Sequence, residues 1–188
     1  LFAPRLHPAI RHAMGPRREL GVRTIFNLLG PLTNPAGARR QVLGVYAAEH
    51  TELFAAVLLG LGSERAFVVH GADGMDEITT TTTTRVSELH AGRLRTYELD
   101  PLQFIESPAS LADLAGGDPA TNAAILTDVL SGKRGPCRDI VCLNAAAGIV
   151  AGGRAADLAE GFRRAAAAID NGRARQALEG LITATRRG

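Results

Sequence analysis

The sequence predicts an α/β fold with a mixed, partly parallel central sheet, flanking helices and a helical C-terminal third. Short apolar runs rich in β-branched residues alternate with one helical segment up to residue 99, and Ala- and Leu-rich segments dominate after residue 120. The chain has 188 residues, of which 46% are hydrophobic and 21% charged. This composition is typical of a globular protein, and the length suits a single α/β domain over residues 1–188.

The first forty residues predict a helix, an apolar run and a loop. Residues 7–20 have helical character, which Gly15 and Pro16 disturb in the middle. Residues 23–29 are apolar, and the Gly-Pro pair that follows ends the run. Residues 32–37 have the composition of a loop.

Residues 41–70 predict a strand, a helix and a second strand. Residues 41–46 and 65–70 are apolar and rich in β-branched residues, whereas residues 52–61 repeat apolar side chains at helical spacing. Thr51 is a candidate N-cap for that helix. Strands joined through a helix usually pair in parallel, so these two predict the parallel part of the sheet.

Three more short strands are predicted at residues 78–84, 85–89 and 94–99. The pair Ala91-Gly92 separates the last two, as a hairpin requires. The Ala- and Leu-rich helices are then expected at residues 122–130, 138–150, 156–169 and 174–185.

Charge and cysteine usage exclude several classes of partner. The formal net charge is +2, and the arginines are scattered, which argues against nucleic acid and leaves an anionic small molecule compatible. The two cysteines, Cys137 and Cys142, suit neither a disulfide framework nor a zinc site, and we expect small apolar side chains in a reducing cytoplasm. No apolar stretch approaches the ~20 residues of a membrane span.

The sharpest local feature is the sequence Gly-Ala-Asp-Gly-Met-Asp-Glu at residues 71–77. It directly follows a predicted strand, and ligands in open α/β sheets bind beyond the carboxyl ends of strands. Asp76 and Glu77 are adjacent carboxylates that repel each other unless a cation or hydrogen bonds lie between them. Magnesium commonly takes one or two such carboxylates. A solvated acidic turn is the alternative interpretation.

A second feature is basic. Arg17 and Arg18 precede Glu19, and an arginine fork grips a carboxylate through two parallel hydrogen bonds. A solvated helix face with a glutamate partner explains the same residues. The chain contains no Gly-rich phosphate loop and no Ser-His-Asp or Cys-His arrangement, so no catalytic residue is assigned.

Several stretches together resemble the anthranilate phosphoribosyltransferases. The most specific is Arg-Thr-Ile-Phe-Asn-Leu-Leu-Gly-Pro-Leu-Thr-Asn-Pro at residues 23–35. The others occur in the family's order and spacing at residues 2–4, 7–9, 17–21, 68–71, 73–77, 116–118, 122–124 and 143–146. The resemblance therefore covers nearly the whole chain, and it implies a fold of the nucleoside phosphorylase and phosphoribosyltransferase type.

The resemblance implies that the anthranilate amine displaces pyrophosphate from phosphoribosyl pyrophosphate, in tryptophan biosynthesis. Asp76 and Glu77 would hold Mg²⁺ against the pyrophosphate, and Arg17 would bind the anthranilate carboxylate. Pro4, His7 and Ile10 would line the route by which anthranilate enters. A cytoplasmic homodimer is implied for the whole enzyme.

The chain departs from the family's pattern in what it lacks. The Gly-Thr-Gly-Gly-Asp phosphate loop, the Lys-His-Gly-Asn segment and the amino-terminal helical domain do not occur in it. We therefore expect the C-terminal part of a larger enzyme, inactive as an isolated 188-residue chain.

Two alternatives stay open at this point. A pyrimidine nucleoside phosphorylase or another paralogue would share the fold, but its nucleobase has no carboxylate for Arg17 to bind. A non-catalytic, nucleic-acid-binding relative would have no reason to retain Arg17 together with Asp76 and Glu77.

Overall fold

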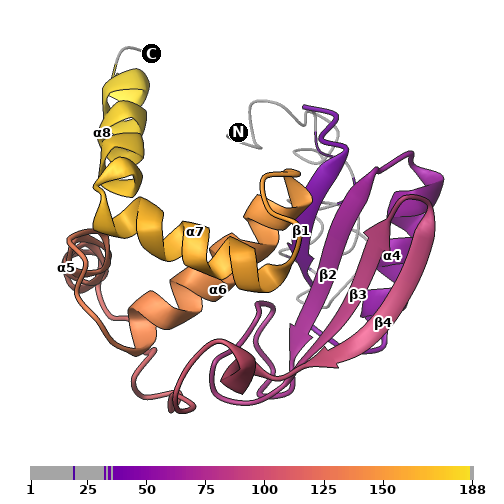
Figure 1. Ribbon diagram of the computed structural model, residues 1–188, viewed down its shortest axis with the longest axis horizontal. Coiled ribbons are helices and arrows are strands. Elements are labelled where there is room, and N and C mark those ends of the chain that lie inside the picture. Colours follow the sequence, from indigo (N-terminus) through magenta and orange to yellow (C-terminus); the bar gives the residue numbers. More distant parts are fainter. Residues whose placement is uncertain (1–18, 20–31, 33, 35, 187–188) are drawn as a thin grey trace. The chain divides into compact units, whose positions relative to one another are not determined.

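The computed structural model describes residues 19, 32, 34 and 36–186. The chain divides into two compact units, Leu1–Arg39 and Arg40–Gly188, and the elements labelled in Figure 1 belong to the second. The predicted helix at residues 7–20, apart from Glu19, and the predicted apolar run at residues 23–29 lie outside the described residues.

A four-stranded mixed sheet forms the centre of the second unit, with strand order β1-β2-β3-β4. Strand β1 (Arg40–Gly44) pairs in parallel with β2 (Arg65–Gly71), and helix α4 (His50–Gly60) connects them. Strands β3 (Thr84–His90) and β4 (Arg93–Leu99) continue the sheet in antiparallel pairing. The predicted parallel pair and hairpin are therefore confirmed.

The β3–β4 hairpin turns at Ala91 and Gly92, whose φ angles are +50° and +74°. Two consecutive residues with positive φ give the turn a twist that matches the flanking strands. Strand β4 is mostly exposed and carries the charged residues Arg93, Arg95 and Glu98, which discourage pairing with another sheet edge.

Two local predictions were wrong. Residues 78–83 do not form a strand, because the hydroxyls of Thr79 and Thr81 bond to the carboxylate of Asp73 instead. Thr51 is not the N-cap of α4: the helix begins at His50, two residues earlier than predicted, with Glu49 as its N-cap, and the Thr51 hydroxyl donates to the carbonyl of Ala48 at 2.9 Å.

The helical C-terminal third is confirmed. After a short 3-10 turn, η1 (Pro101–Gln103), come helices α5 (Pro119–Leu130), α6 (Pro136–Ala151), α7 (Leu158–Asp170) and α8 (Arg173–Arg186). Asp118 and Asp157 cap α5 and α7 by accepting from the backbone amides of Thr121 and Glu160.

Helices cover both faces of the sheet at β2. In Figure 1, α4 lies behind the strands, and α6 reaches β1 with α7 packed against it; α6 contacts both β1 and β2. Phe67 and Val69 face the α6 side, where they meet Leu143, Ala147 and Val150. The alternate residues of β2, Ala66 and Val68, point to the opposite face, and both are fully buried.

Helices α6 and α7 approach closely at a glycine. A Cβ atom on Gly161 would lie 2.8 Å from the carbonyl oxygen of Ala146, which is backbone and cannot swing away. At one end of the same pair, Arg138 is 2% exposed and pairs with Asp170 at 2.8 Å. Its Nη1 also donates to the carbonyl of Gly132 at 3.1 Å. The two helices are thus fixed by close packing and by one ion pair.

Among the described residues, no helix is both long enough and apolar enough to cross a membrane.

Gly161→Ala tests the close approach, with Gly148→Ala as its matched control. Gly148 lies in α6, where a Cβ atom would have nothing within 4 Å, so alanine there should raise the free energy of unfolding by about 1 kcal/mol through helix propensity. At Gly161 the same gain is outweighed by overpacking, which costs roughly 1–3 kcal/mol. Urea unfolding of both variants measures the difference. Equal stabilisation by the two substitutions would contradict the packing described.

Candidate functional site

The acidic loop at residues 72–83 leaves the carboxyl end of β2 beside the carboxyl end of β1. The two strand ends are joined there, since the amide of Val45 donates to the carbonyl of Val69 at 3.0 Å. The ring nitrogen Nδ1 of His70 lies 2.8 Å from the carbonyl oxygen of Val45. Parallel strands therefore present the loop where α/β sheets usually bind ligands, as the sequence predicted.

Asp73 organises the loop from within. One carboxylate oxygen accepts from the hydroxyls of Thr79 and Thr81 at 2.6 and 2.5 Å, and the other accepts from the amide of Met75 at 3.0 Å. Burial by itself raises the pKa of Asp73, but these hydrogen bonds together hold it below its ordinary value of 3.8. Asp73 is therefore a structural acceptor with both oxygens engaged.

Asp76 and Glu77 differ from Asp73 in being exposed and unengaged. Neither carboxylate forms a hydrogen bond or an ion pair with another described residue. Within that part of the chain, no third His, Cys, Asp or Glu joins them as a potential metal ligand. Two free carboxylates fit Mg²⁺, which takes one or two from the protein and completes its shell with water and substrate phosphate oxygens.

Two residues from other elements hold the loop at Asp76 and just beyond Glu77. Asn144 of α6 bonds to the backbone of Ile78, and the last residue of β1, Gly44, lies against the backbone of Asp76. Sequence reasoning singled out neither as part of a site. Asn144 fell within a stretch that carries the resemblance, which was the only available signal.

The other predicted site residues, Pro4, His7, Ile10 and Arg17, lie outside the described residues. Their predicted roles toward anthranilate therefore remain predictions.

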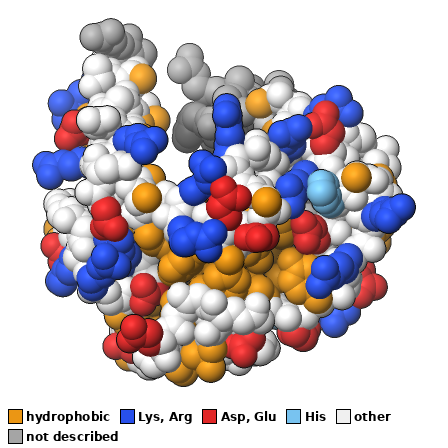
Figure 2. Space-filling model, viewed as in Figure 1, with side chains coloured by type: hydrophobic (Ala, Val, Ile, Leu, Met, Phe, Trp, Pro, Cys, Tyr) orange, Lys and Arg blue, Asp and Glu red, His pale blue; other side chains and the backbone are white. Residues whose placement is uncertain are grey.

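A hollow of about 450 Å³ opens on the α6 side of the sheet, between strands β2–β4 and the neighbouring parts of α6 and α7. Figure 2 shows hydrophobic side chains gathered in a depression with charged groups around it, and the lining includes Phe67, Leu99, Phe104, Val150 and Leu158. Three of its polar side chains contact one another: Glu88 accepts from Tyr97 and pairs with Arg65. Burial and the Glu88 carboxylate raise the pKa of Tyr97. Asp76 and Glu77 do not line this hollow.

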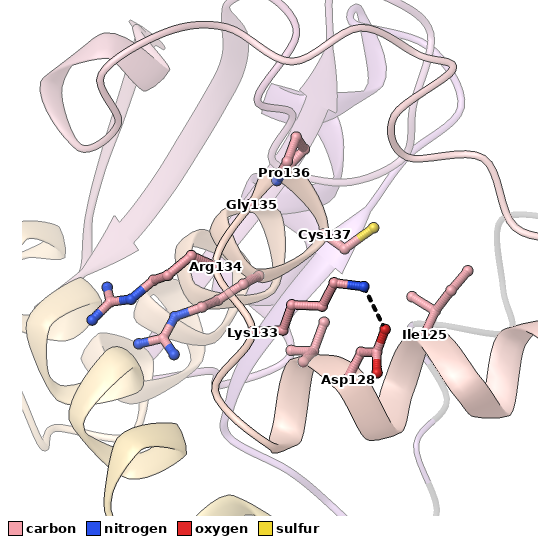
Figure 3. Close-up of a pocket in the computed structure, with 9 residues that line it drawn as sticks. Ile125, Asp128, Lys133, Arg134, Gly135, Pro136 and Cys137 are labelled. Atoms are coloured by element: carbon pink, nitrogen blue, oxygen red, sulfur yellow. Dashed lines mark hydrogen bonds and ion pairs between the residues drawn. The ribbon is translucent and has the colours of Figure 1, made fainter.

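A smaller cavity of about 150 Å³ lies between α5 and the start of α6 (Figure 3). Three basic residues surround it, but each has an acidic partner. Lys133 reaches back to Asp128 at 2.7 Å, as Figure 3 shows, while Arg138 and Arg134 lie 2.8 and 3.8 Å from Asp170. This arrangement locks the α5–α6 connection to α7 and leaves no unpaired cation among the cavity's described residues to attract an anion.

Comparison with known proteins finds relatives that match nearly the whole chain. Residues 1–175 match the family model described as glycosyl transferase family, a/b domain. Anthranilate phosphoribosyltransferase from Syntrophobacter fumaroxidans is 56% identical over 185 residues, which are 98% of this chain and 55% of that protein. The chain thus spans about half the length of the curated relatives it matches.

Solved structures of anthranilate phosphoribosyltransferases have the same fold as this chain. The crystal structure of anthranilate phosphoribosyltransferase from Thermus thermophilus superposes with a TM-score of 0.89 at 44% identity, covering 97% of this chain and 54% of that one. The Saccharomyces cerevisiae enzyme in complex with phosphoribosyl pyrophosphate and Mg gives 0.85 at 33% identity, covering 95% and 52%. The fold type that the resemblance implied is therefore confirmed.

Asp73→Asn should loosen the loop at neutral pH. The substitution removes the charge from the hydrogen bonds of Thr79 and Thr81, and bonds to charged groups contribute roughly 1.5–3 kcal/mol, so amide protection at residues 74–81 should fall at least about tenfold. Asp113→Asn is the matched control, because Asp113 accepts from Ser110 in the same way in another loop. Hydrogen exchange measures both.

The difference in amide protection between the original chain and Asp73→Asn should depend on pH in one direction. Because the folded-state pKa of Asp73 lies below 3.8, the carboxylate's contribution is present above that value and is lost as the pH falls through the lower folded-state pKa. Protection factors of the original chain and Asp73→Asn should therefore converge only below pH 3.8. Equal protection of both chains at about pH 7 would show that Asp73 does not hold the loop.

Proposed function

The chain belongs to the glycosyl transferase family that the a/b domain defines, and from this membership we propose that it is the C-terminal α/β domain of an anthranilate phosphoribosyltransferase. The enzyme would transfer the phosphoribosyl group of phosphoribosyl pyrophosphate to anthranilate in tryptophan biosynthesis. The observation that supports this most directly is the unengaged Asp76–Glu77 pair at the carboxyl end of β2, in a chain 56% identical to a protein of that name.

Each proposed residue has a task that its chemistry suits. Asp76 and Glu77 would bind Mg²⁺ and orient the pyrophosphate oxygens it contacts. Bound there, the cation would neutralise the negative charge that grows on the leaving pyrophosphate. Arg17 would bind the anthranilate carboxylate through a bidentate contact, and Pro4, His7 and Ile10 would line the entry route.

Orientation carries the rest of the reaction. An aryl amine is already neutral at about pH 7, so its nitrogen lone pair can attack the sugar carbon as the bond to pyrophosphate breaks. The nitrogen then loses one proton, to water or to the departing pyrophosphate, and no strong base has to remove it beforehand. Holding the ring so that the amine faces that carbon then contributes much of the rate.

The proposal also includes the homodimer and the cytoplasmic location that the resemblance implies. The nucleoside phosphorylase alternative has no observation in its favour, because the relatives reported above carry the anthranilate name. For the nucleic-acid-binding alternative, the formal charge of +2 gives no support.

A hybrid enzyme tests the proposal. Residues 1–188 would replace the matched segment of the Syntrophobacter fumaroxidans protein, so that the rest of the relative supplies what this chain does not span. The hybrid should form phosphoribosyl anthranilate. Arg17→Ala should raise the KM for anthranilate roughly ten- to a hundredfold and leave the KM for phosphoribosyl pyrophosphate nearly unchanged, because one charge-assisted contact is lost.

The control is Arg163→Ala, which removes an exposed arginine of α7 and should change neither KM. A folded hybrid without transferase activity would contradict the proposed function. Equal weakening of both substrates by Arg17→Ala would contradict the role proposed for that residue.

A further inference from the structure

Asn144 fastens the backbone of Ile78 to helix α6. Its side-chain oxygen accepts from the amide of Ile78 at 3.0 Å, and its side-chain nitrogen donates to the carbonyl of the same residue at 2.8 Å. The same nitrogen donates to the carbonyl of Ile140 at 3.0 Å, which fixes the direction of the amide group. Ile78 directly follows Glu77, and its side chain is buried in the core beside Leu143. The loop is therefore anchored immediately after the acidic pair.

Gly44 supports the loop at the acidic pair itself. A Cβ atom on Gly44 would overlap the carbonyl oxygen of Asp76 and would lie 2.6 Å from its carbonyl carbon. Both atoms are backbone, so any side chain at this position would force the Asp76 peptide to move. The absence of a side chain at the end of β1 is what lets that peptide lie against the strand.

We propose that Asn144 and Gly44 are positioning residues for the cation site, because together they fix the backbone at Asp76 and at Ile78 and so aim the two carboxylates between them. The inference rests on the proposed function, which assigns Mg²⁺ to Asp76 and Glu77. Two adjacent carboxylates repel each other, and a loosely held loop would let them separate. Holding the backbone on both sides reduces the conformational freedom that is lost when the cation binds.

A purely structural role makes a different prediction from a positioning role. If Asn144 only satisfied the backbone of a buried residue, its removal would lower the free energy of unfolding and leave the folded protein's cation affinity unchanged. A positioning role requires the affinity of the folded protein to fall. Residues that orient metal ligands from outside the coordination shell typically change metal affinity by about 10–100-fold when they are replaced.

The test measures Mn²⁺ binding to the hybrid enzyme at a fixed concentration of inorganic pyrophosphate, by electron paramagnetic resonance of the free ion, relative to a protein-free titration because pyrophosphate itself binds the ion. Asn144→Ala and Gly44→Ala should each raise the Kd roughly tenfold or more at a temperature where circular dichroism shows both variants folded. The KM for anthranilate should stay nearly constant, since neither residue is proposed to touch that substrate.

Each variant has a matched control. Asn122 of α5 clamps Gly117 with the same pair of hydrogen bonds, at 2.9 and 3.0 Å, so Asn122→Ala removes an equivalent clamp from another loop. Gly60→Ala adds a Cβ where nothing lies within 4 Å. Both controls should leave the Kd for Mn²⁺ unchanged. Gly44→Ala also keeps the test decisive if Asn144→Ala does not fold.

A reference variant distinguishes the metal assignment of Asp76 and Glu77 from the positioning role of Asn144 and Gly44. The double substitution Asp76→Asn with Glu77→Gln should abolish measurable binding of Mn²⁺ to the protein. If binding persists in that variant, the metal assignment of the proposed function is wrong. If that variant loses binding while Asn144→Ala and Gly44→Ala bind as tightly as the unmodified hybrid, the positioning role is wrong and the metal assignment stands.

Discussion

Strand β2 is enclosed on both faces, and the position of the acidic loop depends on this enclosure. Ala66 and Val68 on one face and Phe67 and Val69 on the other are at most 1% exposed. Fully burying a side chain the size of Val or Phe contributes about 1.5–3 kcal/mol, so the strand cannot slide or turn without a large loss. A shift of one residue would exchange the two faces. The carboxyl end of β2, where the acidic loop begins, is therefore fixed relative to β1 and α6.

Much of the fold could be predicted because its signals are local. The apolar runs at residues 41–46 and 65–70, the helical repeat between them and the four late helices are visible as periodic patterns. The threonine run at residues 79–84 has a high β-propensity and therefore predicted a strand. The hydroxyls of Thr79 and Thr81 instead donate to the carboxylate of Asp73, which holds this segment in a loop. At that point a specific tertiary interaction outweighed a general preference.

The candidate site could be predicted only in part, because some of its contacts join residues that are far apart in the sequence. Asp76 and Glu77 are adjacent in the sequence and follow a strand, so their pattern is visible without a structure. Asn144 lies 66 residues beyond Ile78, and nothing in the intervening sequence reveals that the two meet. The role of Gly44 depends on how closely another peptide approaches it. Such contacts follow from the packing of α6 and β1 around β2, which residue spacing does not show.

The central claim is that this packing presents Asp76 and Glu77 to a single cation. Anomalous diffraction from crystals of the hybrid enzyme soaked with Mn²⁺ and pyrophosphate tests it most directly. The account predicts an anomalous peak bound by an oxygen of Asp76 or Glu77, at about the 2.0–2.6 Å that hard divalent cations take to oxygen ligands, and shared with the pyrophosphate. A fully occupied Mn²⁺–pyrophosphate complex that contacts neither carboxylate would contradict it.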